Sequence, residues 1–133
     1  MTLRISLRDG ERVVVNGAVL RAVGRTDLRV EGKASILRGR EIMGPEQATT
    51  PAKQLYFLTM MAYIDPDGAQ SYHDRIVDAL QQVASILSAA DARAATVSYA
   101  RHVAHLQYYR ALTDCRTLIA LETDLLADTA AAA

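Results

Sequence analysis

The sequence predicts an α+β protein in which an N-terminal antiparallel β-meander of four to five strands precedes three or more α-helices, the last one long. Two observations support this fold class. Residues 2–38 alternate apolar and polar side chains and carry turn signals, whereas apolar residues recur at helical spacing from Gly44 onward. A chain of 133 residues has the size of one domain. We therefore expect a single domain, 1–133, with a basic β-rich half at 1–40, a helical half at 45–128 and a frayed tail at 129–133.

The β-rich half contains short segments with the character of strands, at residues 3–8, 11–15, 18–23, 27–33 and 34–37. In the first of them, LRISLR, apolar and polar residues alternate as in a half-buried strand. Asn16-Gly17 lies between the second and third segments and is a strong signal for a two-residue hairpin, since both central positions of a type I′ turn need positive φ. The predicted register places Arg12 directly opposite Arg21.

The first helix is predicted over residues 51–64. Thr50 is a suitable N-cap, and Pro51 fits the first helical position, where its missing N–H is not needed. The sequence Asp-Pro-Asp-Gly at 65–68 then predicts a turn.

A second helix is expected to start near Asp67 or Ser71 and to end around Ser88, with Ser88 and Asp91 as a cap pair for one long third helical segment. Two apolar stripes run along that segment. They predict contact with two neighbours, one of which could be a second copy of the chain.

Charge is distributed unevenly along the sequence. Residues 1–40 hold nine basic and four acidic side chains, so their net charge is +5, and the rest of the chain carries −5 because the total is zero. This asymmetry favours an anionic partner for the N-terminal part. The candidate contacts for RNA phosphates are Arg4, Arg8, Arg12, Arg21 and Arg29. The alternative is that these guanidinium groups extend into water or pair with Glu11, Asp27 or Glu31, as surface arginines commonly do.

Aromatic residues provide candidate contacts for a protein partner, namely Tyr56, Phe57, Tyr108 and Tyr109. Packing in a core or an interface explains such residues more often than stacking on bases does.

No motif for catalysis or cofactor binding stands out, and we expect no enzyme, cofactor or metal. His102 and His105 lie three residues apart on a predicted helix, but a third metal ligand is lacking. The single cysteine, Cys115, lies among apolar residues, which suits a buried thiol. No long apolar run and no signal peptide is evident, so the sequence predicts a cytoplasmic protein without a membrane contact.

Three stretches, GERVVVNGAVL, ATTPAKQLYF and YIDP, resemble the FlbT family of flagellar regulators. The resemblance covers roughly residues 3–68 and continues as a similarity of length and helical character. It implies a post-transcriptional regulator that binds the 5′ untranslated region of flagellin mRNA and shortens the lifetime of the message, or in some bacteria acts positively. Flagellin and the regulator FlaF are the protein partners it implies. It assigns no binding residues.

Two functions remain open from the sequence. The first is an RNA-binding regulator that uses the arginines and unpaired bases of the leader. The second is a protein-binding module or chaperone-like factor that binds flagellin or a flagellar regulator and affects the message indirectly. The overall neutrality of the chain favours the second, and its basic N-terminal segment favours the first. A homodimer or higher oligomer is expected, through the long helices or a sheet edge.

Overall fold

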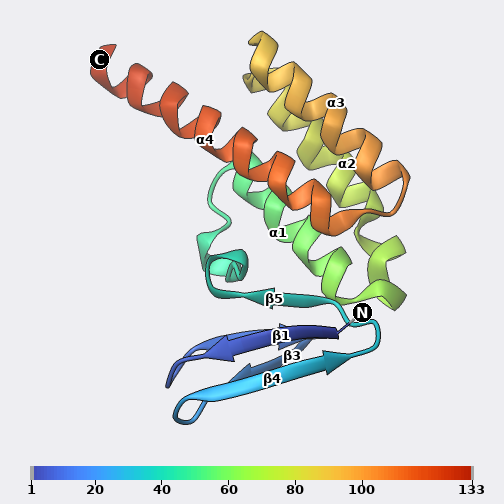
Figure 1. The fold of residues 1–133 in the computed structure, drawn as a ribbon. Coiled ribbons are helices and arrows are strands. Elements are labelled where there is room, and N and C mark those ends of the chain that lie inside the picture. Colours follow the sequence, from blue (N-terminus) through green and yellow to red (C-terminus); the bar gives the residue numbers. More distant parts are fainter. Residues whose placement is uncertain (1, 133) are drawn as a thin grey trace.

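The structure is a computed structural model that describes residues 2–132, and it confirms the predicted fold class: antiparallel strands come first and helices follow, the last of them long (Figure 1). The strands are β1 (Thr2–Leu7), β2 (Arg12–Val15), β3 (Ala18–Arg21), β4 (Thr26–Glu31) and β5 (Ile36–Arg38). The α-helices are α1 (Pro51–Ile64), α2 (Ala69–Ile86), α3 (Ala90–Ala104) and α4 (Tyr108–Ala132). Short 3₁₀ turns are η1 (Gly39–Glu41), η2 (Pro45–Gln47) and η3 (Pro66–Gly68).

The hairpin of β2 and β3 forms as the sequence predicts. Asn16 and Gly17 both have positive φ, 50° and 86°, as a type I′ turn requires. The register pairs Arg12 with Arg21 and Val14 with Val19. The Asn-Gly turn therefore fixes which side chains of the two strands face each other.

The strands do not form one continuous meander, however. They form two small sheets, β1-β4 and β3-β2-β5, so β1 pairs with β4 rather than with its neighbour in sequence. The reason lies in β2, which is apolar on both faces: Val13 packs against Ile5 and Leu7 of β1, and Val14 packs in the helical core. Burying both faces requires a layer on each side of β2. The β1-β4 sheet covers one face and the helices cover the other (Figure 1).

Helix α1 has the predicted bounds. The N–H of Lys53 donates to the Thr50 side-chain oxygen at 3.4 Å, and Pro51 occupies the first helical position. The Asp65–Gly68 turn forms as η3, and α2 then spans the predicted region. Helix α1 packs on α2 and α4 and also contributes to the core shared with β2 and β5, so it is the central element of the helical half.

The long third segment predicted from residue 88 is in fact two helices, α3 and α4, separated by residues 105–107. Leu106 has a φ of 59°, and the N–H of Gln107 donates to the carbonyl of His102 at 2.8 Å, which ends α3. The predicted Ser88–Asp91 cap is also wrong, since α3 begins after Ala89 without a side-chain cap. Neither Gly nor Pro marks the break. The chain reverses there because α3 and α4 pack against each other.

Glu122 on α4 is a buried carboxylate, 4 % exposed, that meets the first turn of α1. Its Oε2 accepts the N–H of Ala52 at 2.9 Å, and its Oε1 accepts the hydroxyl of Thr50. The positive end of a helix dipole favours an anion at this place. This contact holds α4 on the start of α1.

Helix α4 continues to Ala132 and so includes most of the tail for which fraying is expected; residue 133 lies outside the described residues. Across residues 2–132, none of the helices combines the length and apolar character that crossing a bilayer requires.

Candidate nucleic-acid interface

Five arginines lie at or beside the strand termini at one end of the two sheets, which we call the arginine end. β1 and β4 are antiparallel, and so are β2 and its two neighbours. The last residues of β1, β3 and β5 and the first residues of β2 and β4 therefore lie at the same end. The arginines at or beside these strand ends are Arg8, Arg12, Arg21, Arg25 and Arg38.

Three of the five predicted RNA-contacting arginines belong to the arginine end: Arg8, Arg12 and Arg21. The other two, Arg4 and Arg29, lie opposite each other within the β1-β4 pair. They alternate with Ile5 and Leu28, which face the core between the sheets, so Arg4 and Arg29 lie on the outer face. The structure thus places Arg4 and Arg29 on a surface separate from the arginine end.

Arg12 and Arg21 lie on yet another face of the β half. They share the side of β2 and β3 that carries Val14 and Val19, because side chains two residues apart point the same way. Val14 packs into the helical core, so this face is turned toward the helices.

Arg25 and Arg38 were missed from the sequence. Arg25 lies in the turn that enters β4, and Arg38 ends β5 opposite Val13. Only the sheet topology brings them to the other arginines. The order of the strands in the two sheets is the information that would have identified Arg25 and Arg38 as neighbours of the other arginines.

The arginine end is strongly positive. Its turns contain two acidic residues, Asp9 and Glu11, whereas the end holds five arginines. The neighbouring η1 turn adds one positive and one negative charge, Arg40 and Glu41, and so leaves the balance unchanged. All five arginines are exposed. Within residues 2–132, Arg4–Asp27 at 3.7 Å is the single arginine–carboxylate contact closer than 4.0 Å. The guanidinium groups of the arginine end therefore keep their charge available to an external anion.

The alternative in which Arg12 and Arg21 pair with nearby carboxylates does not match this geometry. Glu11 accepts the N–H of Arg8 at 2.9 Å, and Asp27 is engaged by Arg4 and by the hydroxyl of Ser6. Two like charges face each other across the hairpin instead, an arrangement that costs stability unless an anion or water separates them.

Two of the predicted partner-binding aromatics are used inside the molecule. Tyr56 is 2 % exposed, and its hydroxyl donates to the Glu41 carbonyl at 2.7 Å, so it is a packing residue. Tyr109 is 48 % exposed, but its hydroxyl donates to the Glu41 carboxylate and its ring lies 5.3 Å from that of Tyr63. The bond to Glu41 is the main cause that raises the pKa of Tyr109 to about 12. Glu41 thus ties η1, next to Arg38, to the helical half.

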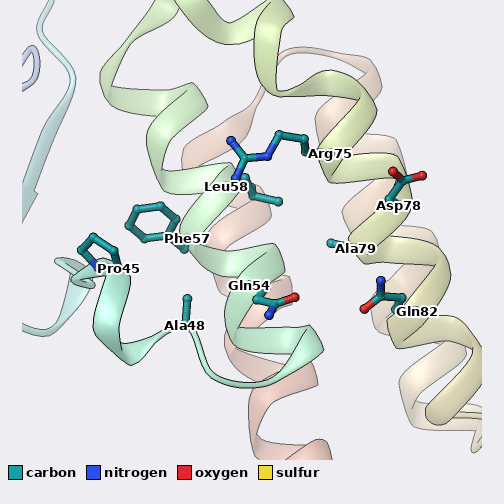
Figure 2. A pocket seen from close by; sticks show the side chains of 9 residues that line it. All are labelled: Pro45, Ala48, Gln54, Phe57, Leu58, Arg75, Asp78, Ala79 and Gln82. Carbon is teal, nitrogen blue, oxygen red and sulfur yellow. The ribbon is translucent and has the colours of Figure 1, made fainter.

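The other two predicted aromatics are half-buried and line hollows. Phe57 borders a cavity of about 460 Å³ together with Pro45 and Leu58, and side chains of α2, among them Arg75 and Asp78, form the other wall (Figure 2). Tyr108 borders two neighbouring hollows that share Leu106. Both residues lie in places that a partner side chain could enter.

The remaining candidate groups serve the fold. His102 Nδ1 lies 2.6 Å from Asp114 Oδ2, which joins α3 to α4. Among the described residues, no group of three or more His, Cys, Asp or Glu side chains is arranged to hold a metal ion. Cys115 is buried, and burial raises the pKa of its thiol.

Fold and site define an α+β protein whose small two-sheet β half, carried on four helices, presents a cationic end. The chain belongs to the family described as flagellar protein FlbT, whose sequence profile matches residues 3–126.

Individual relatives agree with this assignment. The flagellum biosynthesis repressor protein FlbT of Caulobacter vibrioides is 36 % identical over 127 residues, which is 95 % of this chain and 90 % of the relative. A probable flagellum biosynthesis repressor protein FlbT of Caulobacter sp. strain K31 is 35 % identical over 95 % of this chain and 97 % of its own. A protein of the same name in Agrobacterium fabrum is 44 % identical over 69 residues, 52 % of this chain and 46 % of the relative. No solved structure matches the chain.

Proposed function

We propose that this protein regulates flagellin synthesis after transcription, as a repressor that binds the 5′ untranslated region of flagellin mRNA through the arginine end. The observation that carries the proposal is that five exposed arginines lie at one end of the sheets without carboxylate partners among the described residues. Guanidinium groups bind phosphate in a bidentate way and also stack on unpaired bases. The flagellar context comes from relatives that are named flagellum biosynthesis repressors.

The test compares two double variants that remove the same charge from different surfaces. Arg12→Ala/Arg21→Ala disrupts the arginine end, and Arg4→Ala/Arg29→Ala removes the matched pair on the outer face of β1-β4. Each variant is titrated against flagellin leader RNA and an unrelated RNA at several salt concentrations.

We expect the leader RNA to bind more tightly than the unrelated RNA, with affinity that falls steeply with salt. For single-stranded RNA, a plot of log affinity against log salt concentration has a slope of about −0.7 for each phosphate contact. Loss of two contacts should therefore make this slope shallower by about 1.4. Only the Arg12/Arg21 variant should show this change. Equal binding of both RNAs, or equal losses in the two variants, would contradict the proposal.

A second function is supported by the helical half. A hollow of about 390 Å³ between α2 and α3 is mainly apolar, and Val77 and Leu106 at its border are 38 % and 73 % exposed. Such a hollow suits the apolar side chains of a helix. Under this alternative function, the protein binds flagellin or the regulator FlaF, and its effect on flagellin mRNA is indirect. Co-purification from cells that recovers flagellin without its message would favour it.

Assembly into a homodimer or higher oligomer is part of the proposal. All four residues of β3 are exposed, including Val19 and Leu20, and among the described strands β3 pairs with β2 alone. A free strand edge with apolar side chains is a common site of self-association. A monomer mass from light scattering at high concentration would contradict it.

A further inference from the structure

The arginine end is concave where the two sheets meet. A hollow of about 1000 Å³ is lined there by Ser6, Leu7, Arg8, Asp9, Glu11, Arg25 and Arg38. Its three arginines come from three separate segments: the turn after β1, the turn before β4 and the end of β5. Side chains distant in sequence therefore converge on one space.

The two carboxylates of this hollow are held by the backbone. The N–H of Gly24 donates to Asp9 Oδ1 at 2.8 Å, and the N–H of Arg8 donates to Glu11 Oε1 at 2.9 Å. Neither carboxylate lies within 4.0 Å of a described guanidinium group. These acidic groups shape the turns, and the arginines keep N–H donors free for an anion.

One of the three arginines is already oriented. Arg38 Nη2 donates to the carbonyl oxygen of Ser6 at 2.9 Å, which links β5 to β1. A guanidinium group has five N–H donors in a rigid plane, so most of them stay available. Because the group is held in place, less side-chain freedom is lost when a ligand binds.

The number of guanidinium groups indicates which anion fits. A phosphate monoester has three acceptor oxygens and carries between one and two negative charges near neutral pH. An internal phosphodiester offers two free oxygens and one charge. Three guanidinium groups border one concave space and together offer enough N–H donors for the three oxygens of a terminal phosphate, and a chain end can enter such a space from one side.

We propose that this hollow is a binding site for a terminal phosphate group, with Arg8, Arg25 and Arg38 as its ligands. The inference rests on the proposed function for the source of that group, which is the 5′ phosphate of the bound RNA. A free mononucleotide offers the same chemistry and is the other source to be distinguished.

The experiment uses one short leader RNA prepared with a 5′ hydroxyl or a 5′ monophosphate and labelled at its 3′ end. Binding to the full chain is followed by fluorescence anisotropy, with adenosine 5′-monophosphate and adenosine as competitors. The variants are Arg25→Gln, Arg25→Gln/Arg38→Gln and the control Arg4→Gln/Arg29→Gln. Arg25 makes no side-chain hydrogen bond within residues 2–132, so Arg25→Gln separates loss of binding from loss of fold.

We expect the 5′-phosphorylated RNA to bind about tenfold more tightly than the 5′-hydroxyl RNA, a difference of about 1.4 kcal/mol. The preference should shrink in Arg25→Gln, vanish in the double variant and persist in the control. Equal affinity for the two RNAs, or a preference that survives the double variant, overturns the terminal-phosphate site.

The two proposals fail in different ways. RNA binding that ignores the 5′ group leaves the proposed function standing and refutes the hollow as a phosphate site. Arginine-dependent binding of adenosine 5′-monophosphate without RNA binding supports the phosphate site with a free nucleotide as its source, and it refutes the RNA-binding function.

Discussion

Glu122 makes the helical half depend on one buried charge, and replacing it tests the packing of α4 on α1. In Glu122→Ala the buried N–H of Ala52 loses its acceptor, and the Thr50 hydroxyl loses a partner. An unsatisfied buried donor costs about 1–3 kcal/mol, and a lost hydrogen bond about 1 kcal/mol. Loss of an anion at a helix N-terminus adds about 1 kcal/mol. The desolvation of the carboxylate offsets part of this sum.

We therefore expect Glu122→Ala to lower the free energy of unfolding by about 3 kcal/mol, which corresponds to about 10 °C in Tm for a chain of this size. Glu122→Gln keeps an acceptor for Ala52 and should lose about 1 kcal/mol, mainly from the charge. Asp124→Ala is the matched control, since Asp124 is an exposed acidic residue one half-turn further along α4.

Urea denaturation followed by circular dichroism measures all three variants against the wild-type chain. An unfolding free energy for Glu122→Ala within about 0.5 kcal/mol of the wild type, the usual range for surface substitutions, would refute the reasoning. So would an equal loss in Asp124→Ala, because the effect would then belong to charge on α4 in general.

Three further predictions concern single residues. Gly17→Ala should lower the free energy of unfolding, measured by urea denaturation, by about 1–2 kcal/mol, because φ at Gly17 is 86° and an added Cβ would lie 3.4 Å from the carbonyl oxygen of Ile64. An unchanged free energy of unfolding would contradict this. The folded pKa of Tyr109 is raised to about 12 from 10.0, so its bond to Glu41 stabilises the fold below pH 10 and this contribution disappears as the pH rises to about 12. Tyr109→Phe should accordingly remove an absorbance step near pH 12 and reduce stability at neutral pH. Loss of a step near pH 10 instead would speak against the bond. The Cys115 thiol, buried and with a raised pKa, should react with a thiol reagent at pH 8 only as fast as the protein unfolds, and rapid labelling of the native protein would show that it is accessible.

The candidate site could be predicted only in part. The Asn16-Gly17 turn determines the pairing of Arg12 with Arg21, because a two-residue type I′ loop leaves one register. Arg25 and Arg38 could not be found in this way, since their place depends on which strands pair over long range. Alternation in β1 correctly marks Arg4 as outward-facing, but it does not show that this outer face is separate from the face of the hairpin that carries Arg12 and Arg21.

In the helical half, too, some features could be predicted from the local sequence and others depend on tertiary packing. Thr50 and Pro51 determine where α1 begins, because capping and the geometry of proline act within a few residues. The break at Leu106 carries no local signal, and it exists because α3 and α4 gain more by packing side by side than one straight helix would gain.

By itself the sequence determined the Asn16-Gly17 turn, the start of α1, the strand segments and the separation of charge between the halves, all of which depend on neighbours in the chain. Tertiary structure alone decided that β1 pairs with β4, that Glu122 is buried at the start of α1 and that Arg8, Arg25 and Arg38 surround one hollow. The strand pairing buries both apolar faces of β2, and the position of Glu122 depends on the packing of α4 on α1, so each feature rests on contacts between residues far apart in sequence.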